Sequence, residues 1–358
     1  MNILSKYLAK EFLKLLILCQ VIFISLYLMI DFTGGIDDFM KAHAPVYRMF
    51  AYYGYKIPAI FVQMLPVSTL TSVIILFCIM KRNNEVIALN GCGISLWRIA
   101  QPVMFTSLLL SLFSFFLSET IVPYASSLSN AIWRIDVKKE ESNRFQGRNH
   151  VWYRGENAIY WIKRFDGVQM AMNDPTLYFF DGTFKLIRRI DGRRGIWMND
   201  FWRINDGIIQ EREEGGGFSL KRFRSMDLKI PEKPEDFIMV EREPDEMGYR
   251  QLRRFADKLE QEGYNAVRYF VELHIKIAFP FINLIMALVG IPVALWKRTM
   301  GAPMAVSIGI ALCFLYLLIM GLTRTLGFAG IFPPILSAWL ANALFLFLGI
   351  YLMIHANR

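Results

Sequence analysis

The chain has 358 residues, 54% of them apolar, and a formal net charge of +9. Soluble globular proteins average roughly 45–50% apolar residues, and here the excess is concentrated in a few long runs, which excludes an ordinary soluble domain. Residues 123–270 carry 26 basic and 24 acidic side chains, so the remaining 14 basic and 7 acidic ones lie with the apolar runs. The basic surplus therefore indicates membrane topology and gives no reason to expect a nucleic-acid partner.

The sequence lacks the motifs of catalysis and cofactor binding. It has no GxxxxGK[ST] phosphate loop and no nucleophile elbow, and its four histidines are scattered. The four cysteines lie in or beside apolar runs without paired spacing, which argues against disulfides and against a zinc site. We expect no catalytic residue, no metal ion and no cofactor in this chain.

Six apolar runs are long enough to cross about 30 Å of hydrocarbon. They cover residues 12–30, 58–80, 99–122, 271–295, 302–322 and 331–354. The first run is too long for the core of a signal peptide, so we interpret it as a retained span. The predicted fold class is an α-helical integral membrane protein with six transmembrane helices, in which segments 1–122 and 271–358 hold three spans each and 123–270 is a polar insert.

Basic residues beside the runs predict the orientation. The termini and two loops carry nine bases against Glu11 and Glu85: Lys6, Lys10, Lys14, Lys81, Arg82, Arg98, Lys297, Arg298 and Arg358. The other two short loops carry Lys41, Arg48, Lys56 and Arg324 against Asp31, Asp37 and Asp38. The positive-inside rule then places both termini in the cytoplasm and the insert outside.

The insert changes to a period of two from residue 150, which is typical of strands. Eight short strands are expected at 151–153, 158–162, 176–180, 184–190, 195–198, 201–204, 208–212 and 218–223. Turn formers separate several of them, among them Asp181-Gly182, Asp191-Gly192, Asn199-Asp200 and Asn205-Asp206-Gly207. The pattern predicts an all-β sandwich, jelly roll or partly open barrel whose edge strands could accept a partner strand. An amphipathic helix over 249–263 leads to the fourth span.

A short charged stretch, 81–98, lies between the second and third spans on the predicted cytoplasmic side. Asn83 or Asn84 is expected to cap a helix at about 82–91, with Glu85 in its first turn and Gly91 as its stop. Val86, Ile87 and Leu89 give it an apolar side, and Arg82 would fix the loop at the lipid surface. The helix is either a solvated connector or a handle on which another protein pushes, and we favour the handle.

Charges inside or near the spans are the other informative residues. Glu272 and Lys276 are four residues apart on one helix face, so they could pair locally. Alternatively Lys276 pairs with Glu119 and fastens the third and fourth spans together, and the sequence leaves both pairs open. Lys41, Lys56 and Arg324 are predicted near the outer surface, where they would contact lipid headgroups or hold the phosphates of an anionic cargo.

The order and spacing of several short motifs resemble the LptF/LptG family of lipopolysaccharide-export permeases, most closely its LptG members. The resemblance covers the whole chain. The matching motifs are Tyr7-Leu8, Asp37-Asp38-Phe39, Pro58, Leu65-Pro66, Arg82 with Glu85-Val86-Ile87-Ala88-Leu89, Gly93-Ile94-Ser95, Glu119 with Val122-Pro123, Val271-Glu272-Leu273-His274 with Lys276 and Pro280, Ile291-Pro292, Pro333-Pro334 and Trp339-Leu340.

That resemblance implies a permease subunit of an ABC transporter in the bacterial inner membrane, and no enzyme. Its partners would be an LptF-like permease in a heterodimer, an LptB-like ATPase dimer that binds ATP and Mg²⁺, an LptC-like single-span protein and an LptA-like periplasmic bridge. Lipopolysaccharide would enter from the outer leaflet through gates made by the first and fifth spans and rise into periplasmic β-jelly-roll domains. Glu85 matches the family's carboxylate in the ATPase groove, and Arg82, Val86 and Leu89 are predicted to take part in ATPase coupling with it. Asp31 and Ala59 stand where family members carry lipid-binding bases, so Lys41 and Lys56 would substitute.

Two other interpretations remain. One is an ABC-type permease for a lipoprotein or another lipid, for which four spans and an insert after the first would be expected. The other is a membrane-anchored β-domain that serves as a sensor or scaffold, which would need neither six spans nor so many prolines within them.

Overall fold

The computed structural model describes residues 3–138, 148–155, 158–166, 169–182, 184–198, 200–212, 217–234, 243–261, 265–296 and 301–356. The chain divides into two compact units, which are described separately. The helical unit holds residues 1–132, 243–259 and 265–358, and the β unit holds 133–242 and 260–264. Lys297, Arg298 and Arg358, which entered the orientation argument, lie outside the described residues.

The helical unit contains all six predicted spans. Its elements are α1 (Ile3–Lys41), α2 (Val46–Arg82), α3 (Glu85–Gly91), α4 (Leu96–Ile132), η2 (Pro244–Glu246), α7 (Tyr249–Gln261), α8 (Val267–Ala278), η3 (Phe279–Phe281), α9 (Ile282–Leu295), α10 (Ala302–Phe328) and α11 (Pro334–Ala356). The spans are α1, α2, α4, the interrupted α8–η3–α9 helix, α10 and α11, and each is long and apolar enough to cross a membrane. Most extend beyond the runs read from the sequence.

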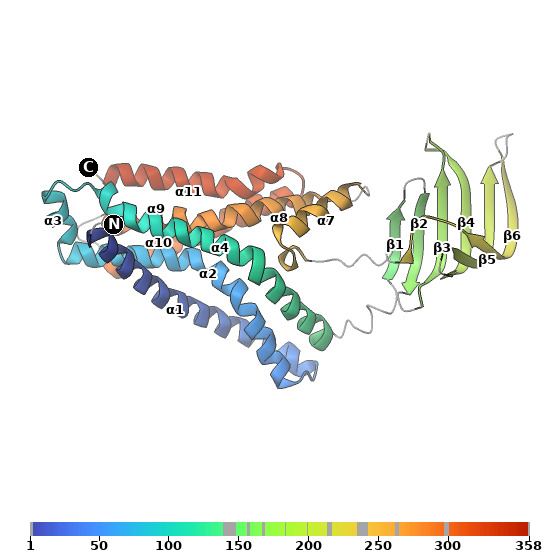
Figure 1. Ribbon diagram of the computed structural model, residues 1–358, viewed down its shortest axis with the longest axis horizontal. Coiled ribbons are helices and arrows are strands. Elements are labelled where there is room, and N and C mark those ends of the chain that lie inside the picture. The colour runs from blue at the N-terminus through green and yellow to red at the C-terminus, as the bar shows by residue number, and fades with distance from the viewer. Residues whose placement is uncertain are drawn as a thin grey trace. The chain divides into compact units, whose positions relative to one another are not determined.

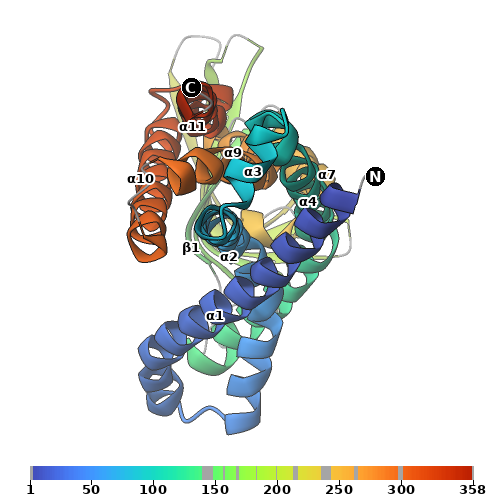
Figure 2. The same cartoon turned by 90° about the vertical axis from the view of Figure 1, so that its left-hand side faces the viewer.

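Both termini and α3 lie at one end of the helical bundle, called here the termini end (Figure 1). Figure 2 views the bundle from that end. The opposite end, called the far end, carries the connections between α1 and α2 and between α10 and α11, together with the start of α7. Loop residues near the membrane therefore gather at two separate levels.

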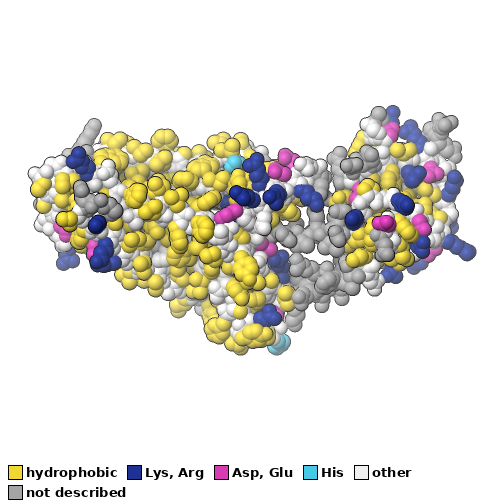
Figure 3. All heavy atoms as spheres, in the orientation of Figure 1, with side chains coloured by type: hydrophobic (Ala, Val, Ile, Leu, Met, Phe, Trp, Pro, Cys, Tyr) yellow, Lys and Arg dark blue, Asp and Glu magenta, His cyan; other side chains and the backbone are white. Residues whose placement is uncertain are grey.

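The centre of the bundle is formed by α2 and by α8–α9. In their most apolar stretches 72% and 78% of residues are buried, compared with 17% in α1 and 22% in α10. The outer helices expose large apolar side chains such as Ile22, Phe113 and Phe314, and the helical unit shows a mostly apolar surface in Figure 3. Such a surface is stable only against lipid or another protein.

The fourth span is interrupted at Pro280, which has no N–H to donate and lies in the middle of the short 3₁₀ segment η3. The Asn342 side-chain amide of α11 donates to the Ala278 carbonyl at the break, over 2.8 Å. The Tyr316 hydroxyl of α10 donates to Asn342 Oδ1 over 2.6 Å. Neighbouring helices thus satisfy a backbone group at the interruption, as a helix break in a bilayer requires.

The β unit contains one antiparallel sheet of six strands in the order β1-β2-β3-β4-β5-β6. The strands are β1 (Arg148–Arg154), β2 (Ala158–Asp166), β3 (Ala171–Phe180), β4 (Leu186–Trp197), β5 (Trp202–Arg212) and β6 (Phe218–Leu228). The all-β prediction is confirmed. Within the described residues β1 and β6 each pair on one side only, so the sheet has open edges.

Two predicted turns are wrong, which is why eight predicted strands become six. Gly192 and Gly207 lie directly opposite each other in the continuous strands β4 and β5. A Cβ on Gly207 would lie 2.4 Å from the Asp191 carbonyl oxygen, so glycine permits close approach of the two backbones. Asp206 adopts a φ of 49° within β5. These turn-forming residues therefore lie within the continuous strands β4 and β5 and do not end them.

The apolar core of the β unit lies on one face of the sheet. It includes Tyr160, Ile162, Leu177, Trp202 and Ile204. The segment after β6 is fastened to this face, since the Trp202 indole N–H donates to the Glu232 carbonyl over 3.0 Å. The Tyr160 hydroxyl donates to Glu232 Oε2 over 2.7 Å. Burial, together with the hydrogen bond to Glu232, raises the pKa of the Tyr160 phenol above its usual range.

Candidate functional site

The short helix α3 is fixed to the termini end of the bundle by its apolar side. Val86 is only 7% exposed and belongs to the core cluster of the bundle, and Leu89 packs against that cluster. Ile87 is 49% exposed, and Arg82 is exposed just before the helix. Glu85 is half-buried at the first position of the helix. The side available to another protein is therefore formed by Arg82, Glu85 and Ile87.

Asn84, one of the two predicted caps, occupies the N-cap position of α3 but forms no cap bond with its side chain. Asn83 ends α2 as its C-cap residue, and Asn84 adopts a left-handed φ of 60° without a side-chain cap bond. Instead, Asn83 Nδ2 donates to Glu85 Oε1 over 3.0 Å. The two asparagines reverse the chain between helices, so Asn84 lacks the extended backbone with which a side-chain cap is usually formed.

The C-terminal turn of α3 depends on Gly93, although Gly91 was the predicted stop. Gly93 has a φ of 79°. Its N–H donates to the Asn90 carbonyl over 2.9 Å, and the Ile94 N–H donates to the Leu89 carbonyl over 3.0 Å. This pair of bonds is a Schellman motif, in which the left-handed residue is usually glycine. The motif fixes the direction in which the chain enters α4.

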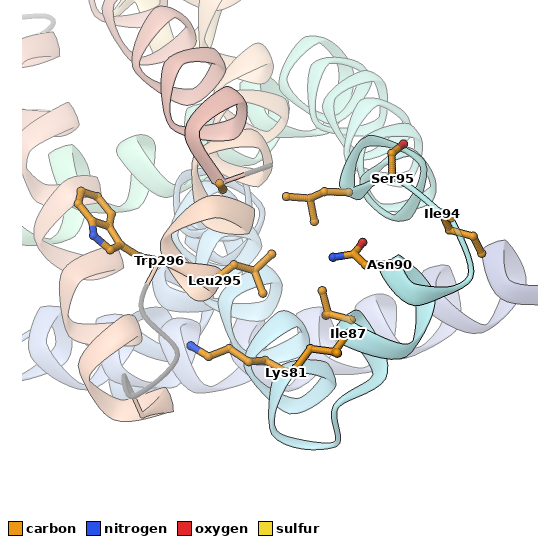
Figure 4. Close-up of a pocket in the computed structure, with 11 residues that line it drawn as sticks. Lys81, Ile87, Asn90, Ile94, Ser95, Leu295 and Trp296 are labelled. Carbon is orange, nitrogen blue, oxygen red and sulfur yellow. The ribbon is translucent and has the colours of Figure 1, made fainter. Parts of the chain in front are cut away.

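A pocket of about 800 Å³ lies between α3, the end of α9 and the end of α11. In Figure 4 the Asn90 side chain points toward Leu295 across this space. Lys81 also lines the pocket, and its ammonium donates to the Ala294 carbonyl of α9 over 3.1 Å. The positions of α2, α3 and α9 at the termini end are thus linked by direct contacts.

Val86 and Leu89, predicted to take part in ATPase coupling, face the interior of their own bundle. Both side chains anchor α3, so a force on the exposed side of the helix would pass directly into α2, α4 and α9, which supply most of that core. Ile87, predicted on the same apolar side, is instead exposed. Its neighbours at i−1 and i+2 are the anchors, a distinction that a seven-residue apolar pattern does not reveal.

The far end holds charges within the spanning helices. Arg324 of α10 donates from Nε to Glu272 Oε1 of α8 over 2.8 Å, and its Nη2 contacts the same oxygen. Glu272 is 5% exposed. The Arg324 guanidinium also lies 5.4 Å from the centre of the Phe328 ring. Arg324 was predicted to face lipid phosphates, whereas here it neutralises a buried carboxylate.

Neither predicted pair of Lys276 is formed. Glu119 accepts a hydrogen bond from the Tyr249 backbone N–H over 2.6 Å, at the first residue of α7. Gly248 leaves room for this carboxylate, because a Cβ there would lie 3.0 Å from Glu119 Oε1. A carboxylate suits the positive end of a helix dipole. Glu119 therefore connects α4 to α7, and Lys276 has no ion pair among the described residues.

The first two spans carry a second ion pair near the far end. The Lys56 ammonium lies 2.6 Å from Asp31 Oδ2 and 3.3 Å from the Tyr52 hydroxyl. Asp31 and Lys56 are 25 residues apart, and a sequence pattern does not predict such a contact. Lys41, at the end of α1, is exposed.

These clusters place paired charges between neighbouring helices. Among the described residues, no group of three or more His, Cys, Asp or Glu side chains could hold a metal ion. The geometry instead offers an anchored helix at one end of the bundle and ion pairs between helices at the other.

Comparison with known proteins identifies the family. Residues 6–355 match the model of the family described as lipopolysaccharide export system permease LptF/LptG. The chain is 20% identical over 363 residues to the lipopolysaccharide export system permease protein LptG of Escherichia coli K12, and equally to that of E. coli O6:H1 strain CFT073. Each match covers 99% of both chains. With six spanning helices, a β-sheet insert and a family match over nearly its whole length, the chain belongs to the LptF/LptG family of lipopolysaccharide export system permeases.

Proposed function

We propose that this chain is the LptG-like permease subunit of an ABC transporter that extracts lipopolysaccharide from the outer leaflet of the bacterial inner membrane. Family membership and full-length similarity to two LptG proteins support this proposal. ATP and Mg²⁺ would bind a separate ATPase, since the sequence has no phosphate loop.

The partners follow from that role. An LptF-like permease would complete a heterodimer, and an LptB-like ATPase dimer would bind at the termini end. The β unit, with its open edges at β1 and β6, would pass lipid to an LptC-like protein and an LptA-like bridge by adding strands to the sheet. Lipopolysaccharide would enter between peripheral helices, among them α1 and α10.

The termini end is proposed to face the cytoplasm and the β unit the periplasm. Lys6, Lys10 and Lys14 lie at the start of α1, and Lys81, Arg82 and Arg98 border α3 at the same end. This concentration of bases agrees with the positive-inside rule.

One observation carries the coupling role of α3, namely that its apolar side is buried in the core while Glu85 lies on the side that remains accessible. A rigidly seated helix can transmit a displacement, whereas a mobile loop would absorb it. We infer that Glu85 accepts a hydrogen bond from a basic residue of the ATPase, and that Arg82 and Ile87 complete the contact.

The test is replacement of Glu85 in the complex reconstituted into lipid vesicles. Glu85→Ala should lower lipopolysaccharide release about 10-fold or more, since a charge-assisted hydrogen bond contributes roughly 1.5–3 kcal/mol. Glu85→Lys should lower it further by repulsion. ATP hydrolysis and lipid release are measured on the same vesicles, so that uncoupling is separated from failure to assemble.

The matched control is Glu11→Ala, which removes a carboxylate at the same end of the bundle that pairs with Lys14 over 2.6 Å. It should leave lipid release unchanged. Full lipid release by both Glu85 variants would contradict the coupling role.

The cargo path is proposed to use exchange of ion pairs. Lys41 is exposed, and Lys56 and Arg324 are held by Asp31 and Glu272. An anionic headgroup would have to compete with these carboxylates. Two other functions, export of a different lipid and a scaffold role, are less well supported, because the six spans match the LptF/LptG family. Purification without an ATPase and a second six-span chain would favour the scaffold.

A further inference from the structure

Glu272 is a buried carboxylate whose counter-ion belongs to another helix. It lies on α8 in the centre of the bundle, and Arg324 lies on α10. A carboxylate surrounded by protein and lipid is stable only when paired, and loss of one partner leaves an uncompensated charge. The contact therefore ties the stability of Glu272 to the position of α10.

The helix α10 lies at the periphery of the bundle, whereas α8 lies in its centre. Its outer surface exposes Phe314, Leu317 and Leu322, among other large apolar side chains. Near the far end its described contacts to α8 and α11 include Arg324 with Glu272 and the close approach of Gly327 to Ser337 and Val271. A shift of the far end of α10 would exchange these protein contacts for lipid contacts and would leave Glu272 without Arg324.

Arg324 has alternative surroundings when it leaves. Its guanidinium lies over the ring of Phe328, four residues along the same helix, and its side chain is 46% exposed. The Phe328 ring and lipid headgroups would stabilise the cation after separation. Glu272, buried on α8, needs a different replacement.

Lys276 is placed to supply a replacement positive charge for Glu272. It lies four residues after Glu272 on the same face of α8, in the Glu-to-Lys order that favours pairing. It is half-buried and forms no hydrogen bond or ion pair among the described residues. The acidic groups that act on it are Asp245, Glu119 and Glu272.

The other two acids near Lys276 are less suitable as its partner. Glu119 is already engaged by the Tyr249 N–H, and Asp245 is exposed. The remaining cation on α8, Arg268, pairs with Glu243 over 3.2 Å. Figure 3 shows such basic and acidic side chains gathered at this end of the helical unit. Glu272 is thus the buried acid near which Lys276 provides a second cation besides Arg324.

We propose that Lys276 is the substitute counter-ion of Glu272. The Lys276 ammonium pairs with the Glu272 carboxylate when α10 moves away and carries Arg324 with it. In this exchange the carboxylate is neutralised by Arg324 in the docked state and by Lys276 in the released state. The proposal rests on the proposed transport function only in assuming that α10 moves during the cycle. Lys276 is a positioning residue, acting through Glu272.

The first test compares lipid release by three variants of the reconstituted complex. Lys276→Met should lower release at least about 10-fold, because the released state leaves Glu272 unpaired. Lys276→Arg should retain release. The double variant Glu272→Gln/Lys276→Met should recover to within about threefold of Glu272→Gln alone, because a neutral amide at position 272 needs no counter-ion.

A second readout needs no transport. In a chain without its four native cysteines, Thr323→Cys places a thiol at a buried position of α10. The rate at which a water-soluble maleimide labels it in lipid vesicles reports release of α10. Labelling should slow with Lys276→Met, and the double variant should lose that effect. Arg250→Met, which removes an exposed base of α7, should label at the rate of the parent chain.

Two results would overturn the proposal: parental labelling by Lys276→Met, or a double variant as slow as Lys276→Met alone. The latter would assign Lys276 to Glu119 or Asp245. A wild-type complex that releases no lipopolysaccharide would refute the proposed function, while the labelling rates of the chain alone would still decide the exchange.

Discussion

At the scale of single residues, Glu232 shows how the β unit depends on one buried hydrogen bond. Its carboxylate is 7% exposed and accepts from the Tyr160 hydroxyl over 2.7 Å. Tyr160→Phe should lower the free energy of unfolding of the β unit by about 1–3 kcal/mol, the cost of leaving a buried polar group without its partner. Urea denaturation of the solubilised chain, followed by near-ultraviolet circular dichroism, measures this change.

Tyr178→Phe is the matched control, because Tyr178 is a half-buried strand tyrosine whose ring lies 5.4 Å from the Arg189 guanidinium. It keeps that ring and should leave stability within about 0.5 kcal/mol of the parent. Alkaline pH gives an independent check. Because the folded-state pKa of Tyr160 is raised, its stabilisation is complete below about pH 10 and is lost as pH rises above it, when the unfolded phenol ionises first. Tyr160→Phe should lack this alkaline loss, and equal losses in both chains would contradict the assignment.

Single residues were predictable where local chemistry decides their role. The predicted apolar side of α3 is confirmed for Val86 and Leu89, which helical spacing places on one side. It is wrong for Ile87, which is 49% exposed. The partners of Glu119, Glu272 and Lys56 were not predictable. Their contacts join residues 130, 52 and 25 positions apart, and such pairs are fixed by helix packing.

At the scale of elements, α3 is ended by backbone conformation. Gly93→Ala should destabilise the turn by about 1 kcal/mol, because an L-residue with a side chain is strained at a φ of 79°. The turn directs α3 against the bundle, so ATP hydrolysis and lipid release should become partly uncoupled. Both are measured in the reconstituted complex.

Gly91→Ala provides the comparison. Gly91 is the last residue of α3, and it has no left-handed φ and no heavy atom within 4 Å of the point that a Cβ would occupy. Alanine there should be neutral or slightly stabilising, since it favours helix over glycine. A larger effect at Gly91 than at Gly93 would mean that the terminating residue has been misassigned.

The lengths of strands were harder to predict than their existence. Asp191-Gly192 and Asn205-Asp206-Gly207 have the composition of turns, yet both lie within strands because the two glycines face each other across β4 and β5. Turn propensity is a local preference, and pairing along a long ladder outweighs it. The apolar face of α7, by contrast, is as predicted, with Leu252, Ala256 and Leu259 buried.

At the scale of the whole molecule, six spans and an all-β insert could be predicted because hydrophobic length and period are properties of the chain itself. The boundary between the two units was harder to predict from the sequence. The segment 243–259 belongs to the helical unit, although its composition resembles the polar insert. The Asn130 amide of α4 donates to Glu246 Oε1 over 2.9 Å, a contact that only the folded bundle creates.

The orientation of the molecule can be tested with a residue that the chain already carries. Cys92, directly after α3, is exposed, whereas Cys19, Cys78 and Cys313 are buried. A membrane-impermeant maleimide should therefore label Cys92 in inside-out vesicles and leave it unmodified in intact spheroplasts, if α3 faces the cytoplasm. A cysteine introduced at Lys163, which is exposed on β2, should show the opposite pattern in a Cys92→Ser chain. Labelling of Cys92 from outside would invert the topology, and with it α3 could no longer be the contact through which a cytoplasmic ATPase drives the bundle.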